Sequence, residues 1–222
     1  MTLSGILHPL FVPTYGILIY CFAFSRLQVT LPTAYWLVGC IGTFFMTALI
    51  PLSLMIFRRL RGEISDISIS KAPERTPIYL YTLICYAFWC YFLYKVMYSP
   101  FLCVIGIGAT TSLALVLLIN SRWKISAHLT GLGGLFGGIL AYTYNYTLPL
   151  PIVAISIILA LALLLMYARL YLEAHTPMQV VTGFLLGIIM TFTPTYLYHQ
   201  VRSSSKSYTP SAWLIPLRTK KG

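Results

Sequence analysis

Long runs of apolar residues alternate with short polar segments along most of the chain. Seven of these runs approach the length of about 20 residues that a helix needs to cross the hydrocarbon core of a bilayer. None has the alternating apolar and polar positions of an outer-membrane β-barrel strand. The pattern therefore predicts an all-α protein, a polytopic integral membrane bundle of six to seven transmembrane helices. The expected spans lie near 8–25, 35–57, 77–97, 100–119, 127–145, 150–168 and 177–198.

The connections between these spans are short. A turn around Tyr98–Pro100 joins the third span to the fourth, and a polar turn at 145–149 joins the fifth to the sixth. Asn145-Tyr-Thr matches a glycosylation sequon, but so short a loop favours the turn. The first segment lacks a basic leader, so we expect no cleavable signal peptide. Residues 1–200 are expected to form one transmembrane domain, followed by a basic tail over 201–222.

Composition agrees with this picture. Hydrophobic residues make up 59% of the 222 residues and charged ones 9%, which is more apolar surface than one soluble core of this size can bury. The net charge of +11 lies in the segments between spans and in the tail, where membrane surfaces explain it better than nucleic acid does. The five cysteines have no paired or metal-type spacing and are expected to act as small buried apolar residues.

The charged residues fall unevenly on the two faces of the predicted bundle. If all seven segments cross, the stretches 58–76, 120–128 and 169–176 emerge on one face. That face carries all four carboxylates and 8 of the 15 cations, so the positive-inside rule leaves the orientation open. A rim rich in cations and poor in carboxylates favours an anionic ligand.

The third stretch on this face contains the sharpest local signal. Thr176-Pro177-Met-Gln179 has the form of a capping box, with threonine at the N-cap, proline at the first helical position and glutamine at the third. His175 directly precedes this helix start, where an anion is favoured and an imidazole can meet it. Arg169 lies at the end of the preceding span, where it either extends to the membrane surface or binds an anion.

The second stretch predicts a similar arrangement. Ser126 is a suitable N-cap, and His128 then lies in the first turn of a membrane helix. A buried histidine with purely structural partners is the alternative. The glycines that follow form two overlapping GxxxG pairs, Gly133/Gly137 and Gly134/Gly138, which permit close approach of another helix within the chain or between chains.

The first stretch is less distinctive. Arg58 to Arg61 are expected to flank a span, and Pro77 is expected to open the next helix. Lys71 and Arg75 are candidates for phosphate binding, because a guanidinium makes bidentate contacts with phosphate and an ammonium adds a compact charge.

Two histidines at helix starts on one face, each with cations upstream, are suited to phosphoryl transfer through a phosphohistidine. One histidine would attack phosphorus and the other would protonate the departing alkoxide, while cationic and backbone donors stabilise the phosphate oxygens. No metal or other cofactor is expected, because four carboxylates are too few for a carboxylate-rich metal site.

Over residues 58–187 the chain resembles the membrane-bound type-2 phosphatidic acid phosphatases (PAP2). That family carries a Lys/Arg-Pro motif, a Pro-Ser-Gly-His motif, and an Arg followed six residues later by His and then by Asp. Here they correspond to Lys71…Arg75-Thr-Pro77, to Ile125-Ser-Ala-His128, and to Arg169…His175…Gln179. The resemblance implies His175 as nucleophile and His128 as general acid. It also implies phosphate binding by Arg169, Arg75, Lys71 and Ser126.

The chain departs from the family at three places. Ala127 replaces a glycine, the first motif is reduced so that Lys124 can substitute for Lys71, and Gln179 stands where the family has the aspartate that orients the nucleophile. An amide can fix the imidazole tautomer but cannot stabilise an imidazolium by charge. Glu173 or Glu74 are candidates to supply that charge.

Two functions remain open at this level. The first is a metal-independent phosphatase acting on lipid A, phosphatidylglycerophosphate, phosphatidate or a polyprenyl diphosphate. The second is a catalytically weak or inactive relative that binds or translocates an anionic lipid. The resemblance implies a location in the bacterial cytoplasmic (inner) membrane, with the site on the periplasmic side and the tail in the cytoplasm. Oligomeric state and headgroup preference are not predicted by the sequence.

Overall fold

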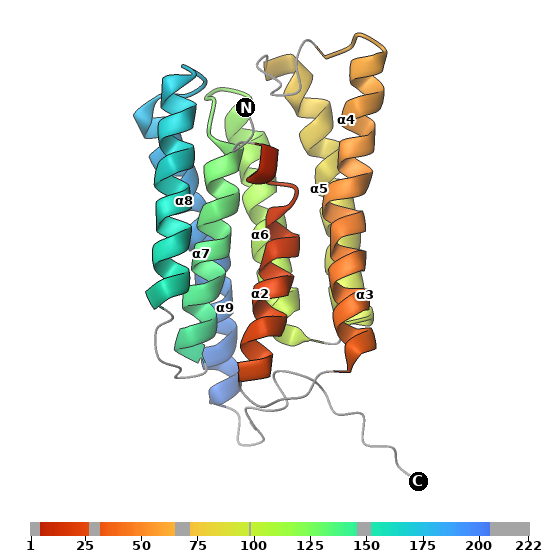
Figure 1. The fold of residues 1–222 in the computed structure, drawn as a ribbon, viewed down its shortest axis with the longest axis vertical. Coiled ribbons are helices and arrows are strands. Elements are labelled where there is room, and N and C mark those ends of the chain that lie inside the picture. The colour runs from red at the N-terminus through yellow and green to blue at the C-terminus, as the bar shows by residue number, and fades with distance from the viewer. Residues whose placement is uncertain (1–4, 27–31, 65–71, 98, 146–151, 205–222) are drawn as a thin grey trace.

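The fold is described from a computed structural model that covers residues 5–26, 32–64, 72–97, 99–145 and 152–204. In this part of the chain the helices run along one common direction as a bundle (Figure 1). Their bounds are α2 Val12–Arg26, α3 Thr33–Phe44, η1 Phe45–Leu49, α4 Ile50–Leu60, α5 Ala72–Lys95, α6 Pro100–Asn120, α7 Ala127–Asn145, α8 Ile152–Tyr171 and α9 Pro177–Ser203.

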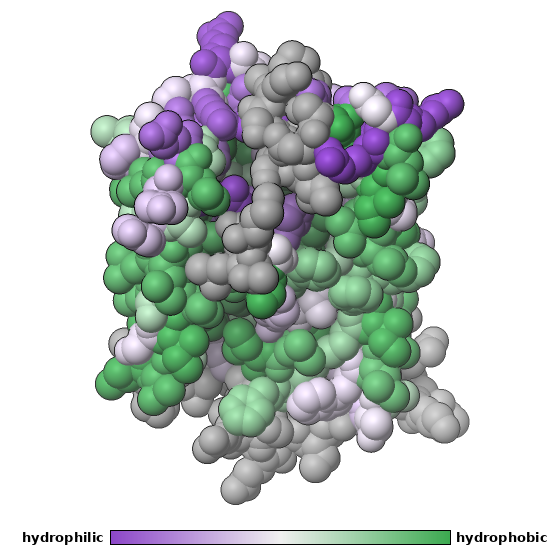
Figure 2. All heavy atoms as spheres, turned by 45° about the horizontal axis from the view of Figure 1, so that its top comes forward, coloured by the Kyte–Doolittle hydropathy of each residue, from purple (hydrophilic) through white to green (hydrophobic). Residues whose placement is uncertain are grey.

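The predicted class is confirmed, since the described residues are helical and contain no strand. Large apolar side chains such as Phe88, Leu118 and Leu163 are about two-thirds exposed, as expected of surfaces that face lipid. Figure 2 shows an apolar belt beneath a hydrophilic end. Within the described ranges, five helices are long and apolar enough to cross a membrane: the continuous helix from Thr33 to Leu60, α5, α6, α8 and α9. Helix α2 is shorter, and α7 is not among the five.

A segment of π-helix, η1, joins α3 to α4 without a break. Pro51 explains its position, because a proline has no N–H to donate to the carbonyl four residues earlier and its ring clashes with that turn. The wider π turn absorbs this mismatch. Thr47, inside η1, donates its hydroxyl to the carbonyl oxygen of Leu10 at 3.2 Å, so this irregular turn also contacts the N-terminal segment.

Two helix starts follow different rules. Helix α6 begins at Pro100 after Ser99, whose hydroxyl accepts the N–H of Leu102 at 3.4 Å, as expected at an N-cap. Helix α5 begins at Ala72, so the expectation that Pro77 opens it is wrong. Pro77 lies in the second turn of α5, where it removes one backbone hydrogen bond and leaves those of the rest of the helix intact. The negative charge of Glu74, in the first turn, is favoured by the helix dipole. Arg75 therefore belongs to a helix and not to a connector.

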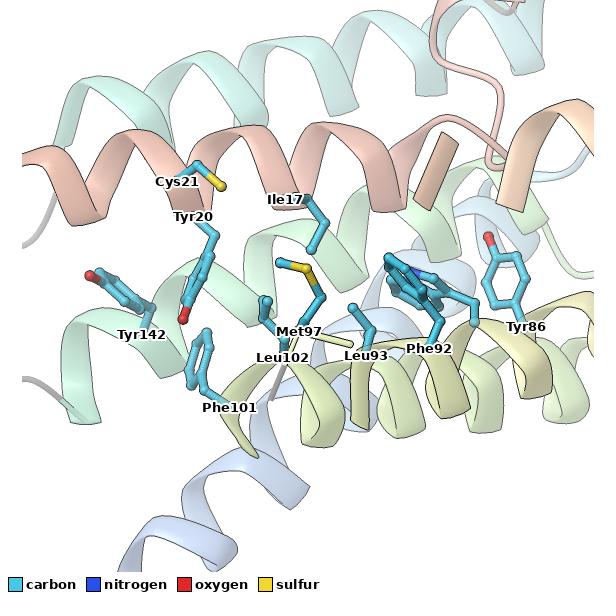
Figure 3. Packing of buried hydrophobic residues seen from close by; sticks show 11 residues of the cluster. Ile17, Tyr20, Cys21, Tyr86, Phe92, Leu93, Met97, Phe101, Leu102 and Tyr142 are labelled. Carbon is cyan, nitrogen blue, oxygen red and sulfur yellow. The ribbon is translucent and has the colours of Figure 1, made fainter. Parts of the chain in front are cut away.

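Backbone-to-backbone packing of α7 against α9 forms the centre of the bundle. A Cβ atom added to Gly133 would meet the backbone carbonyl of Phe184, and one added to Gly187 would meet that of Thr130. The predicted pair Gly133/Gly137 thus packs against a second pair, Gly183/Gly187, within the same chain. Side chains of α2, α5 and α6 pack in an adjoining apolar cluster that includes Ile17, Leu93 and Phe101 (Figure 3).

Candidate active site

The tight packing of α7 on α9 brings two helix starts together at the hydrophilic end of the bundle. The backbone N–H of Ser126, directly before α7, donates to the carbonyl oxygen of Gln179 in the first turn of α9 at 3.2 Å. His175 Nδ1 lies 3.1 Å from the carbonyl oxygen of Lys124. Residues 124–128 and 175–179 therefore form one unit, although about 50 residues separate them in sequence.

The start of α9 agrees with the glutamine half of the predicted capping box. The helix begins at Pro177, and the backbone N–H of Thr176 donates to Oε1 of Gln179 at 3.1 Å. The same oxygen lies 3.2 Å from His175 Nδ1. Because both neighbours of this Nδ1 are acceptors, His175 carries its proton there, and the lone pair of Nε2 remains available as a nucleophile.

The surroundings of His175 also keep it uncharged. Burial lowers the pKa of His175 to about 4, and the positive charges of Lys124 and Arg169 act in the same direction. The hydrogen bonds to the Lys124 carbonyl and to Gln179 oppose this shift without cancelling it. At neutral pH the imidazole is therefore in the form that can attack an electrophile.

His128 and Arg169 are in direct contact. A terminal nitrogen of Arg169, in the last turn of α8, lies 2.5 Å from Nε2 of His128. A guanidinium can only donate, so Nε2 of His128 is the acceptor in this arrangement. Arg169 is only 5% exposed, and among the described residues its Nε has no hydrogen-bond partner. This buried donor is suited to an anion.

Arg75 brings a second buried guanidinium to the same region. It is 5% exposed and donates to the side-chain oxygen of Asn120 at 3.1 Å. Asn120 is the last residue of α6, so α5 and α6 together hold this arginine in place. Helix α5, which contains Arg75, and helix α8, which contains Arg169, lie on opposite sides of the bundle (Figure 1).

All four of these side chains line one cavity of about 1340 Å³. Its polar residues include His8, Arg75, His128, Arg169 and His175. Most of the remaining wall is apolar and comes from α2, α5, α6 and α7; it includes Ile17, Leu93, Leu102, Leu113, Val116 and Ile139. The cavity therefore joins a cationic, histidine-containing region to a long apolar space inside the bundle.

The model of the PAP2 superfamily matches residues 40–203. The chain belongs to the PAP2 superfamily. No curated protein and no solved structure matches it. The matched region contains both histidines and both arginines described above, whereas residues 5–26 lie outside it. PAP2 proteins are in general phosphatases, so a phosphatase-type activity is the family's general expectation for this chain.

The remaining predicted residues have different positions. Lys71 lies outside the described residues. Lys124 contributes its carbonyl oxygen to His175, and its charge acts on that imidazole. Ser126 precedes α7 as expected, but its hydroxyl is buried and has no hydrogen-bond partner among the described residues. The expected side-chain cap at Ser126 is therefore not formed.

Glu173 serves to end α8. It adopts a φ of 51°, in the left-handed region, two residues after the last residue of the helix. The N–H of Ala174 donates to the carbonyl of Arg169 at 3.0 Å, and that of Glu173 donates to Leu170 at 2.9 Å, which is a Schellman motif. Its side chain is exposed, and it is not among the described groups that shift the pKa of His175. This turn reverses the chain between Arg169 and His175.

His8 is a site residue that the sequence analysis did not identify. Its ring centroid lies 5.1 Å from that of His128, with the rings at 80°. The only sequence signal was a polar residue beside Pro9 inside an otherwise apolar segment.

The described residues include no cluster of three His, Cys, Asp or Glu side chains that could hold a metal ion.

Proposed function

We propose that this PAP2 protein is a lipid phosphatase that hydrolyses a phosphate monoester or diphosphate headgroup through a phosphohistidine. The observation that carries this proposal is the convergence of His175, His128 and two buried arginines on one end of a cavity whose other walls are apolar. A phosphorylated headgroup fits the cationic end, and the lipid chain fits the apolar space.

The first chemical step uses the fixed tautomer of His175. Its Nε2 lone pair attacks phosphorus, and the bond between phosphorus and the ester oxygen breaks. Arg169 and Arg75 stabilise the charge on the phosphate oxygens. Because the phosphate competes with His128 for the guanidinium of Arg169, Nε2 of His128 can carry the proton that it donates to the departing oxygen.

The second step regenerates the protein. His128, now neutral, accepts a proton from a water molecule as that water attacks the phosphohistidine. The P–N bond breaks and returns neutral His175 with inorganic phosphate. One water is consumed, and one alcohol and one phosphate are produced, or one lipid monophosphate and one phosphate from a diphosphate. No step requires a metal, so phosphate release is expected to continue in the presence of a metal chelator.

The test is phosphate release by purified protein from phosphatidate, phosphatidylglycerophosphate, lipid A and a polyprenyl diphosphate. Wild type is compared with His175→Ala and His128→Ala. The matched control is His199→Ala, on α9 about 33 Å along the helix from its first residue. Phosphate release by wild type and by His199→Ala, but not by the other two variants, supports the proposal. Recovery of a base-stable phosphoprotein when the reaction is quenched without acid supports the phosphohistidine. Equal background release from all four proteins removes it.

Gln179 favours one alternative, a protein that binds or translocates an anionic lipid without turnover. Its uncharged amide holds His175 but cannot stabilise an imidazolium, and it also caps α9 through Thr176. This alternative predicts saturable binding of lipid phosphates that depends on Arg169, with no phosphate released by any variant. The same panel, measured for binding as well as release, separates the two functions.

A further inference from the structure

A short non-helical strap, residues 7–11, precedes α2 and contributes His8, Pro9 and Leu10 to the lining of the cavity. Pro9 and Pro13 have no N–H groups, which prevents a regular helix through this stretch. The backbone instead forms tight turns, with the N–H of Phe11 donating to the carbonyl of His8 at 2.9 Å. In Figure 1 this segment lies beside the start of α7, near the N-terminal end of the chain.

Side chains from distant helices hold the strap in position. Thr47 donates its hydroxyl to the carbonyl oxygen of Leu10 at 3.2 Å, and Tyr86 donates to that of Pro9 at 3.5 Å. A Cβ atom on Gly131 would lie 3.5 Å from Pro9 and 3.3 Å from Val12, so the strap packs directly on α7. Because Gly131 is three residues after His128, both lie on the same face of α7.

This anchoring places His8 over the reaction centre. Its ring packs edge to face with His128 at 5.1 Å, and it lines the same cavity. Nδ1 of His8 accepts the backbone N–H of Leu10 at 3.4 Å. The ring proton therefore lies on Nε2, which makes no hydrogen bond to any residue in the described part of the chain.

Burial and the nearby charge of Arg169 lower the pKa of His8 to about 4. The imidazole is thus neutral near pH 7 and offers one N–H donor without adding a charge. His8 is partly buried, and the cavity that it lines is the one that holds His128, His175 and Arg169, so its N–H faces the same space as these side chains.

We propose that His8 is a third histidine of the site and that its Nε2–H donates to an oxygen of the bound phosphate ester. This assignment rests on the proposed function. It adds a substrate-binding residue from a segment that the PAP2 match, over residues 40–203, does not reach. His8 then contributes to binding of the phosphate beside the leaving-group side of the site, where His128 acts.

The experiment separates donation of a hydrogen bond from ring packing. His8→Phe keeps an aromatic ring against His128 and removes the donor, whereas His8→Gln keeps an N–H donor. His199→Phe is the matched control. For each protein, kcat and KM for a lipid phosphate and the inhibition constant of vanadate are measured, together with the thermal transition in detergent. Vanadate serves as the probe because it imitates the transferred phosphoryl group.

We expect His8→Phe to lower kcat/KM roughly tenfold or more and to weaken vanadate inhibition similarly, as loss of a hydrogen bond to a charged group does. His8→Gln should recover part of both, and His199→Phe should match wild type. Equal kcat/KM and equal vanadate inhibition in His8→Phe and wild type would overturn the assignment. An equal fall in His8→Phe and His8→Gln with unchanged vanadate inhibition also overturns it, because packing alone then explains the effect.

Phosphate release and vanadate binding by the wild-type protein show whether a failure concerns the role of His8 or the proposed phosphatase function. If wild type releases no phosphate but binds vanadate, the phosphatase function fails, and the vanadate affinity of His8→Phe still decides the role of His8. If wild type neither turns over nor binds vanadate, both are overturned.

Discussion

Nδ1 of His175 and Oε1 of Gln179 are 3.2 Å apart, one helical turn from each other at the start of α9. The amide oxygen is also held by the backbone N–H of Thr176. Its orientation is therefore fixed by the helix start and not by the histidine alone. A neutral acceptor occupies a position where a carboxylate would both orient the imidazole and stabilise its protonated form.

Replacing this amide by a carboxylate of the same shape should shift the pH dependence of turnover. Protonation of His175 blocks attack, so kcat/KM should fall as pH falls through about 4 in the wild type. In Gln179→Glu the carboxylate favours the imidazolium and raises the pKa of His175. The fall of kcat/KM with decreasing pH should therefore begin at a higher pH. Profiles of kcat/KM for both proteins measure this.

The phosphate group of the substrate itself ionises near pH 6. This ionisation affects the pH profiles of both proteins equally when the same substrate is used. Gln179→Asp, which has the shorter carboxylate, should increase turnover near pH 7 if the missing charge limits the rate. Identical acid limbs in the wild type and in both carboxylate variants would show that residue 179 does not act on His175.

Acid should destabilise the folded protein through two partly buried histidines at the site. The pKa values of His8 and His175 are lowered to about 4 from an unfolded value of 6.5. Stability from these neutral groups is therefore fully present above pH 6.5 and is lost as pH falls from 6.5 towards 4. The thermal transition should fall over this range, and less steeply in His175→Asn. The same slope in both proteins would contradict the assignment for His175.

The contact between Arg169 and His128 predicts that lysine cannot replace this arginine. An ammonium lacks the planar pair of donors needed to bind phosphate oxygens in two places. Arg169→Lys should lower kcat/KM by about 10²-fold, comparable to loss of one transition-state donor. Arg122→Lys, at an exposed cation on the same end, is the control. Steady-state kinetics with intact folding would decide this, and near wild-type kinetics in Arg169→Lys would count against the role.

The apolar part of the cavity predicts selectivity for long chains. Gly16 lines it, and a Cβ atom there would lie 3.7 Å from Leu135, so a larger side chain projects towards the cavity space. Gly16→Leu should increase KM for a long-chain lipid phosphate while leaving that of a short, water-soluble phosphate ester nearly unchanged. An equal increase for both substrates would argue that the lipid chain lies elsewhere.

Glycines on neighbouring positions of α7 should differ sharply in tolerance. A Cβ atom on Gly133 meets backbone of α9, whereas one on Gly134 lies 3.5 Å from a methyl group of Thr191. Overpacking typically costs about 1–3 kcal/mol, and backbone cannot move aside as a side chain can. Gly133→Ala should lower the thermal transition and the activity, while Gly134→Ala should do neither. Comparable stability of the two variants would contradict the observed packing.

Local and periodic signals in the sequence predicted much of this structure. The start of α9 at Pro177 follows from a capping box within four residues, and the shared end of the three polar stretches follows from the number of spans between them. The GxxxG pair Gly133/Gly137 was also visible. What the sequence did not reveal was its partner, because Gly183/Gly187 becomes recognisable only when α7 and α9 are placed together.

The features that sequence analysis missed depend on long-range contacts. His8 reaches the site because Thr47 and Tyr86 hold a strap broken by prolines, and no local pattern encodes those distances. Pro77 was read as a helix start, although a proline is also tolerated in the second turn of a helix that begins earlier. The predicted cap at Ser126 is not formed, because its buried hydroxyl makes no hydrogen bond to any of the described residues.

The glycine contact between α7 and α9 also bears on how the chain is assembled in the bilayer. Helix α7 is not among the five helices apolar enough to cross on their own, and 11 of its 19 residues are buried by the rest of the bundle. We therefore expect its stable insertion to depend on α9, which is synthesised after it. Truncation before residue 177 should leave α7 poorly inserted, so the reaction centre can form only after translation has passed the last helix.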